Sequence, residues 1–330
     1  MITLDKITKT YNKGAIKAVT DVSLDIRRSE LFGLIGPDGA GKSTLFRILT
    51  TLLLPDSGTA TVNNLDVVKD FAKIRSSVGY MPGRFSLYQD LTIEENLHFF
   101  ATVFGTTIKE NYNLIKDIYQ QIEPFKDRRA GKLSGGMKQK LALCCALIHK
   151  PAVLFLDEPT TGVDVVSRKE FWEMLARLKA EGITILVSTP YMDEANRCDR
   201  IALIQKGSIL SVDTPAGIIA KFPMDLYGIR AANTHQLLRE VRSYSNTDSC
   251  FAFGDALHVT FKDHSPGDTP HVTFKDHGPG APTAANPAND LLPYLRSKGI
   301  SDPTIEKITP GIEDCFIHLL GTPAAATSNN

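Results

Sequence analysis

A glycine-rich segment at residues 36–44 constrains the fold of this chain more than any other feature. It reads Gly-Pro-Asp-Gly-Ala-Gly-Lys-Ser-Thr and matches G-x-x-x-x-G-K-[ST] from Gly36 to Ser43. The apolar run Leu31–Ile35 precedes it, and a helix-like stretch, Ser43–Leu54, follows it. Glycines let backbone N–H groups turn inward around phosphate oxygens, and the N-terminal end of the following helix adds positive potential. The segment therefore predicts a site for the phosphates of ATP or GTP.

Two side chains of this segment have distinct expected roles. We expect Lys42 to reach the β- and γ-phosphates and Ser43 to place its hydroxyl on Mg²⁺. The predicted nucleotide-binding residues of the segment are Gly36, Pro37, Asp38, Gly39, Ala40, Gly41, Lys42, Ser43 and Thr44.

Two carboxylates stand at the end of a second apolar run. Asp157 and Glu158 follow Val153–Leu156, which has the composition of a buried strand. An acidic residue at a strand tip beside a phosphate-binding loop is the expected second holder of Mg²⁺, usually through water. The next carboxylate, Glu158, would be positioned to activate the attacking water as general base. Two solvated acids at a strand end are the alternative, which the upstream loop disfavours.

A third short segment, Leu133-Ser-Gly-Gly-Met137, precedes a helical stretch at 138–148. Ser134, Gly135 and Gly136 at a helix start would form another N-terminus that faces a phosphate. Two anion-binding helix ends in one chain suggest that one of them serves a nucleotide bound elsewhere.

The first 215 or so residues alternate strand-like and helical patterns, which favours an α/β fold with a mostly parallel sheet. Alternating apolar and polar residues in the first thirty positions predict an antiparallel flank. A helical subdomain is expected at about 85–150, where Thr92 and Glu95 have capping-box spacing.

Composition changes after about residue 220, and we expect a small C-terminal α+β domain at 221–320. Within it a near-copy of residues 258–267 recurs at 271–280, which predicts a duplicated strand and turn with solvated histidines. The final residues, 321–330, are expected to be disordered.

Composition excludes several classes of protein. Lys plus Arg equals Asp plus Glu at 37 each, which gives no support to nucleic-acid binding. No run approaches the roughly 18 apolar residues that cross a bilayer, and the N-terminus lacks the pattern of a secretory signal. The five cysteines show no CxxC spacing and are expected to be buried free thiols in a reducing compartment.

The order and spacing of GPDGAGKST, LSGGM and FLDEP resemble the ATP-binding-cassette (ABC) ATPase family over residues 1 to about 220. The resemblance implies a P-loop NTPase core that binds ATP and Mg²⁺. It also implies a head-to-tail dimer with a second cassette, identical or different, in which each nucleotide lies between one P-loop and the partner's Ser134–Gly136 segment. Tyr11 matches the aromatic residue that stacks on adenine, and Asp164 matches an aspartate that communicates between the two sites.

Two positions depart from the family pattern. Gly83 stands where the family usually has a glutamine that helps to hold Mg²⁺ and water, and Pro190 stands where it usually has a histidine that contacts the γ-phosphate. Because proline has no hydrogen-bond donor, we expect strong ATP binding with slow hydrolysis at this chain's own P-loop.

The stretches 84–88, 188–195 and 310–320 resemble cassettes of the ABC-2 exporter class. This resemblance implies an integral membrane permease as partner and a peripheral location on the cytoplasmic face of the inner membrane. Phe85, Leu87 and Tyr88 are candidates for a groove that receives a helix of that permease, with plain core packing as the alternative.

Two other functions remain open. One is a hydrolysis-weak ABC subunit that completes a partner cassette's site, which Gly83 and Pro190 favour and Glu158 disfavours. The other is a soluble ABC protein that acts on ribosomes or DNA. A single P-loop, the absence of a heptad run and the balanced charge disfavour the latter.

Overall fold

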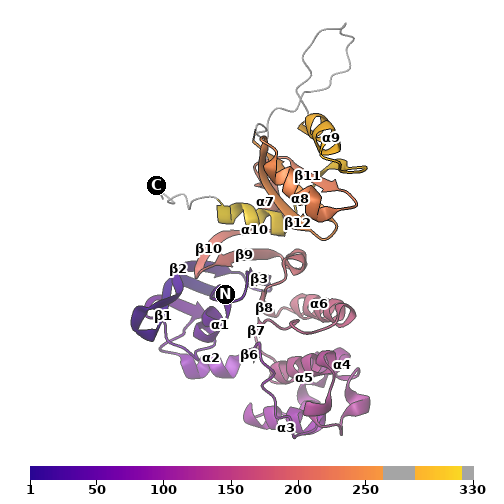
Figure 1. The fold of residues 1–330 in the computed structure, drawn as a ribbon. Helices are drawn as coiled ribbons and strands as arrows, with labels where there is room; N and C mark the ends of the chain where they lie inside the picture. The colour runs from indigo at the N-terminus through magenta and orange to yellow at the C-terminus, as the bar shows by residue number, and fades with distance from the viewer. Residues whose placement is uncertain (263–286, 322–330) are drawn as a thin grey trace, which may run out of the picture. The chain divides into compact units, whose positions relative to one another are not determined.

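A computed structural model describes residues 1–262 and 287–321 (Figure 1). The chain divides into two compact units, Met1–Ile218 and Ile219–Asn330, which we describe separately.

The centre of the first unit is a six-stranded sheet in the order β10-β9-β3-β8-β7-β6. The neighbours β9, β3, β8, β7 and β6 pair in parallel, and β10 closes the edge as an antiparallel hairpin with β9. The strands β3, β7 and β8 are buried along their whole length, as expected of a parallel sheet covered on both faces. Their bounds are β3 (Leu31–Ile35), β6 (Val78–Met81), β7 (Val153–Asp157), β8 (Thr184–Thr189), β9 (Arg200–Gln205) and β10 (Ser208–Asp213).

A second, antiparallel sheet confirms the predicted flank. Its order is β2-β1-β4-β5, and alternate residues of β1 and β2 are buried in the core. The strands are β1 (Ile2–Tyr11), β2 (Ile16–Ile26), β4 (Ser57–Val62) and β5 (Leu65–Asp66).

Helix α1 (Lys42–Leu49) joins the two sheets through one hydrophobic core. Phe46 is fully buried and meets the ring of Phe155 on β7 edge-on at 6.2 Å between centroids. Ile2 and Val62 of the antiparallel sheet belong to the same core. The helix is shorter than the stretch predicted from the sequence, because Thr51 takes a left-handed backbone with φ 62° after the last turn.

The predicted helical block is present and contains α3 (Ile93–Val103), α4 (Ile108–Tyr119) and α5 (Gly135–Leu147) (Figure 1). Thr92 and Glu95 form the expected capping box at α3, and Thr107 with Glu110 forms another at α4. The other helices of the unit are α2 (Phe71–Ser77), α6 (Val165–Ala180) and α7 (Pro215–Ala220), with short 3₁₀ turns at Asn12–Gly14, Glu123–Phe125, Ala130–Lys132 and Met192–Arg197.

A buried carboxylate, Glu194, ties together three segments at the carboxyl end of the parallel sheet. Its side chain is 3% exposed and accepts hydrogen bonds from Thr160 at 3.0 Å and from Thr189 at 2.5 Å. Arg168 of α6 donates to it at 3.1 Å and also stacks over the ring of Tyr191. The charge is therefore paired and fully hydrogen-bonded, which is the condition for keeping it buried.

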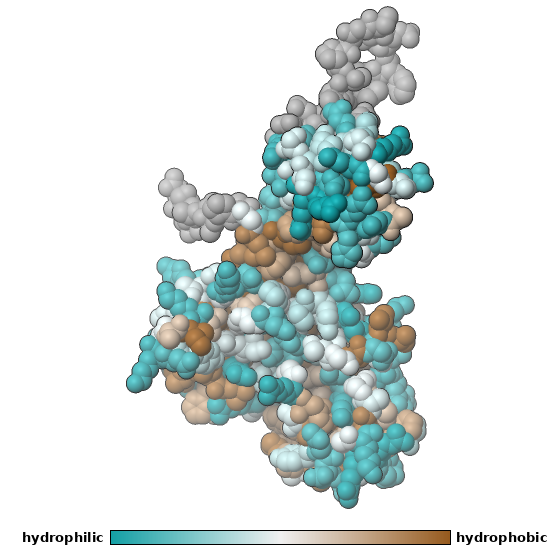
Figure 2. All heavy atoms as spheres, in the orientation of Figure 1, coloured by the Kyte–Doolittle hydropathy of each residue, from teal (hydrophilic) through white to brown (hydrophobic). Residues whose placement is uncertain are grey.

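The second unit has a four-stranded antiparallel sheet in the order β12-β13-β11-β14. Alternate residues of β13, including Leu257, Val259 and Phe261, share a core with residues of α8 and α9. In Figure 2 hydrophobic side chains gather over α10. The elements are β11 (Leu226–Arg230), α8 (Thr234–Ser243), β12 (Thr247–Phe253), β13 (Ala256–Phe261), α9 (Pro287–Ser297), β14 (Thr304–Ile308) and α10 (Ile312–Gly321).

Several expectations fall on residues that the structure does not describe. Residues 258–261 of the duplicated segment belong to β13, but the rest of the first copy from residue 263, the second copy and the tail 322–330 lie outside the described residues. All five cysteines are buried thiols, as expected. Among the described helices, none is long and apolar enough to cross a membrane.

The contacts of Glu194 predict a specific loss of stability. Glu194→Ala removes the buried acceptor of the Arg168 guanidinium and of two threonine hydroxyls, so we expect the free energy of unfolding to fall by about 2–3 kcal/mol. Urea unfolding followed by the fluorescence of Trp172, the single tryptophan, measures it. Asp193→Ala is the matched control, because Asp193 also meets Arg168 but is 76% exposed, and its loss should cost less than about 1 kcal/mol. Equal effects of the two substitutions would contradict this account.

Candidate nucleotide-binding site

The loop 36–44 lies between β3 and α1, and its glycines are required by close contacts. A Cβ atom at Gly36 would lie 2.2 Å from the carbonyl oxygen of Ile204 on β9. Gly41 has φ 106°, and a Cβ there would lie 2.4 Å from the carbonyl oxygen of Ala18 on β2. Both positions therefore exclude every residue with a side chain.

The loop presents backbone donors that have no acceptor within the described chain. The N–H groups of Gly39, Gly41, Lys42 and Ser43 enter none of its described hydrogen bonds. They stand at the start of α1, where the unpaired N–H groups of the first turn carry positive potential. Such a group of donors fits the oxygens of a phosphate chain.

Lys42 is the buried cation of the site. Its residue is 3% exposed, and its Nζ donates to the carbonyl oxygens of Gly36 at 2.8 Å and Pro37 at 3.0 Å. The same Nζ lies 3.1 Å from Oε1 of Glu158. The ammonium thus joins the loop after β3 to the end of β7, two segments that are more than a hundred residues apart in the sequence.

Glu158 has a strained backbone that Ser188 holds in place. Its φ is 50°, a left-handed conformation that non-glycine residues rarely adopt and that costs on the order of 1 kcal/mol or more. The N–H of Glu158 donates to the carbonyl oxygen of Ser188 at 3.1 Å and to its Oγ at 2.9 Å. Strain of this kind is typical of active sites, where a side chain must point in one direction.

Asp157, the residue before Glu158, is buried. Its Oδ1 accepts the hydroxyl of Ser188 at 2.6 Å, which leaves its other oxygen without a hydrogen bond among the described contacts. Burial raises the pKa of the nearby Tyr80 to about 12, and the charge of Asp157 adds to the rise. A Cβ built at Gly83 would lie 3.1 Å from the carbonyl oxygen and 3.8 Å from Oδ2 of Asp157, so Gly83 lies next to this residue without a side chain of its own.

The two other positions near the loop are Tyr11 and Pro190. The hydroxyl of Tyr11, at the end of β1, lies 3.4 Å from Oγ1 of Thr44. Pro190 follows Thr189, whose carbonyl oxygen accepts the N–H of Gly36 at 3.3 Å. Residue 190 therefore directly follows the residue whose backbone contacts the start of the loop.

A second group of predicted residues gathers elsewhere in the unit. Ser134 is the N-cap of α5 and accepts the N–H of Met137 at 3.3 Å, and Ser134 and Gly135 are exposed. A Cβ at Gly136 would lie 2.8 Å from Oγ of Ser167. No described contact joins this group to the loop 36–44.

Asp164 lies beside this second group. It caps α6 by accepting the N–H of Ser167 at 3.0 Å, and hydrogen bonds from Ser167 lower the pKa of its carboxyl. This capping role follows from the structure and was not part of the sequence prediction.

Sequence reasoning missed the residues that support the site. Ser188 and Glu194 are both in the quoted stretch 188–195, but apart from Thr189 the partners Glu158, Thr160 and Arg168 are 26 to 34 residues away along the chain. One signal could have indicated Ser188. It is a polar residue near the end of a buried strand, as Asp157 is at the end of another.

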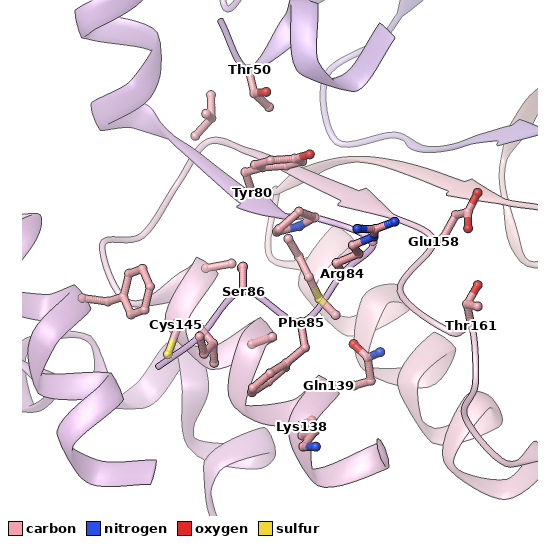
Figure 3. A pocket seen from close by; sticks show the side chains of 18 of the residues that line it. Thr50, Tyr80, Arg84, Phe85, Ser86, Lys138, Gln139, Cys145, Glu158 and Thr161 are labelled. Atoms are coloured by element: carbon pink, nitrogen blue, oxygen red, sulfur yellow. The ribbon is translucent and has the colours of Figure 1, made fainter. Parts of the chain in front are cut away.

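A cavity lies next to the site and is shown in Figure 3. Its volume is about 390 Å³, and its lining includes Glu158 and Gly83 of the site. Phe85 and Leu87 also line it, with Nζ of Lys138 5.4 Å from the Phe85 ring centroid. Tyr88 is not among the lining residues; it is half-exposed and packs edge-on against Phe99.

Comparison with known proteins identifies the family. Residues 19–161 match the model of the ABC transporter family. The multidrug ABC transporter ATP-binding protein YbhF of Escherichia coli, described as probable, is 36% identical over all of this chain, which spans 53% of YbhF. The ABC transporter ATP-binding protein NatA of Bacillus subtilis is 38% identical over 64% of this chain and 88% of NatA. This chain thus spans about half of the first relative and most of the second.

Solved structures agree with this result. The bacterial ABC transporter cassette MJ0796, solved as a dimer, superposes with a TM-score of 0.59 at 28% identity, over 65% of this chain and 98% of the cassette. CbiO1 of Clostridium perfringens superposes with a TM-score of 0.60 at 27% identity, over 67% of this chain and 90% of that chain. The predicted α/β nucleotide-binding fold is confirmed, and the chain belongs to the family of ABC transporter ATP-binding proteins.

Proposed function

We propose that this chain is the ATP-binding subunit of an ABC-2 type exporter and that it binds and hydrolyses ATP to drive transport through a partner membrane subunit. The observation that carries the proposal is the contact of Lys42 with both the loop 36–44 and Glu158. It brings a phosphate-binding cation within 3.1 Å of a candidate general base. The names of relatives point the same way, since two are a doxorubicin resistance protein and a Nod factor export protein.

The contact between Lys42 and Glu158 suggests how nucleotide prepares the site. A lysine ammonium has three donors, and two of them are fixed by the carbonyl oxygens of Gly36 and Pro37. A γ-phosphate oxygen would compete with Glu158 for the third. Glu158 would then be released from its ion pair and could accept a proton from water.

The residues around Asp157 fit a bound Mg²⁺. Carboxylate and hydroxyl oxygens are the ligands this ion prefers, and it keeps several waters. Ser43 and Asp157 would hold it, while Ser188 keeps one oxygen of Asp157 engaged. The ion would supply positive charge at the phosphate oxygens.

Dimerisation with a second cassette would complete the site. Ser134 and Gly135 are exposed at the start of α5, where their N–H groups are available to a nucleotide on another molecule. Val165 and Val166 next to Asp164 are 78% and 68% exposed. Burial of these two apolar side chains against a partner would stabilise such a dimer.

The cavity next to Phe85 is the proposed site for the membrane subunit. Phe85, Leu87 and Phe100 give it apolar walls, and an apolar helix face is the typical ligand of such a groove. Docking there would place the chain on the cytoplasmic face of the inner membrane. Because Glu158 lines the same cavity, the docked helix and the hydrolytic site would share a wall.

A hydrolysis-weak subunit is the second candidate function, and Gly83 and Pro190 favour it. Neither position offers a side-chain donor to the region of Asp157 and the loop 36–44. Groups that position or transfer protons contribute about 10²–10⁴-fold to a rate. ATPase rates of this chain alone and with its membrane subunit would separate the two candidates.

Pro190→His tests the cause of slow hydrolysis. We expect the purified chain to hydrolyse ATP slowly and the variant to be about 10²-fold faster, because an imidazole regains a donor beside Gly36. Pro190→Ala is the control, since it restores a backbone N–H but no side-chain donor, and it should stay near the parent rate. A parent that hydrolyses ATP at ordinary transporter rates, with no gain in the histidine variant, would refute the explanation.

Phe85→Ser tests the docking groove. We expect the fraction of the chain that sediments with membranes of the native cell to fall about tenfold or more, because central aromatic contacts dominate interfaces. Phe125→Ser is the control, since Phe125 is 39% exposed and lies outside the groove. Both variants should bind ATP as the parent does. Unchanged sedimentation of the Phe85 variant would assign Phe85 to packing alone.

A further inference from the structure

The second unit contains its own cavity, which the nucleotide chemistry does not use. Its volume is about 320 Å³, at the lower end of the range for small-molecule sites. Strands β11, β12 and β13 form one side and α10 forms another. Its lining residues include Leu226, Asp248, Ser249, Phe251, His258, Thr260, Asp314 and Ile317.

The register of the sheet explains why this cavity has a polar wall. Leu257, Val259 and Phe261 of β13 belong to the hydrophobic core with α8 and α9. The alternate residues His258 and Thr260 therefore face the other way, because successive strand residues point to opposite faces. Thr260 pairs with Ser249 and His258 with Phe251 on β12, which brings all four to the same face.

The polar wall is built from fixed hydrogen bonds. Thr260 is 1% exposed, and its hydroxyl donates to Asp248 at 3.1 Å. The hydroxyl of Ser249 lies 2.7 Å from that of Thr260 and must donate to it, since the Thr260 proton is already used. The lone pairs of Ser249 and Asp248 stay available as acceptors on this wall.

His258 is fixed in a similar way. Its Nδ1 lies 2.7 Å from Oδ1 of Asp314, and Oδ2 of Asp314 accepts the N–H of Gly311 at 2.8 Å. The stacked ring of Phe253, 4.1 Å away between centroids, covers one face of the imidazole. No described hydrogen bond uses Nε2, which is a further candidate acceptor for a ligand besides Ser249 and Asp248.

The charge of the lining selects the class of ligand. Two carboxylates, Asp248 and Asp314, line the cavity, and none of the described lining residues is a lysine or arginine. Phosphates, nucleotides and carboxylates would meet like charge here. A cation would instead find a carboxylate, hydroxyl oxygens and the aromatic face of Phe251.

We propose that this cavity is a binding site for a protonated amine with an apolar body. The ammonium group would lie at Asp248 and Ser249, and the apolar body would lie against Leu226, Phe251 and Ile317. None of the residues that line this site belongs to the nucleotide-binding site, so binding of an amine could be measured separately from binding of ATP.

Isothermal titration calorimetry of the full chain tests the proposal with 2-phenylethylamine as probe. We expect saturable binding with one site per chain. Two related probes, 2-phenylethanol and 3-phenylpropionate, should bind about tenfold more weakly or worse, because the alcohol lacks the positive charge that strengthens a hydrogen bond to a carboxylate and the propionate adds a like charge.

Asp248→Asn should reduce the affinity for the amine to that for the alcohol, while ATP binding stays as in the parent. Asp255→Asn is the matched control, since Asp255, like Asp248, is exposed, but it lies at the turn between β12 and β13 and does not line the cavity. Thr260→Val should also weaken the amine, because Asp248 loses its hydroxyl donor and its fixed position. Absence of saturable binding, equal binding of amine and alcohol, or an Asp248 variant that binds like the parent would overturn the proposal.

Discussion

The site of this protein depends on the position of one buried ammonium group. Lys42 could not remain charged away from water without acceptors, and it has three of them: two carbonyl oxygens of its own loop and the carboxylate of Glu158. The carbonyl contacts give the loop its closed shape. The carboxylate contact connects that shape to the end of β7, where the acidic residues stand.

The strands and the helix around Lys42 hold the residues of the site close together. Strands β3, β8 and β7 are neighbours in a buried parallel sheet, so their carboxyl ends meet at one edge. The loop 36–44, Ser188 and Asp157 each follow or end one of these strands. Helix α1 then packs between the two sheets through Phe46, which fixes the direction of the first helical turn and of its N–H groups.

Local patterns in the sequence were sufficient for the parts of the structure that are determined locally. The strand Leu31–Ile35, the capping box of Thr92 and Glu95, and the antiparallel flank are confirmed, because each depends on residues within one element or one hairpin. The network of Glu194 could not be predicted, since its partners come from three segments whose proximity only the fold determines. The cavity beside His258 could not be predicted for the same reason, because Asp314 lies 56 residues from His258 in the sequence. The capping role of Asp164 was visible in principle, since Asp before a helical run is a common N-cap.

The most direct test of the account is the affinity of the full chain for ATP, measured by calorimetry with Lys42→Ala and with Lys179→Ala as a control. Lys179 also forms an ion pair, with Asp199, but its side chain is 36% exposed, and it belongs to α6 and not to the loop 36–44. We predict that Lys42→Ala weakens ATP binding by about 10²-fold or more, as expected for loss of a buried charged partner, and that the control binds like the parent. An alanine variant at position 42 that takes up ATP as tightly as the parent would contradict the central claim.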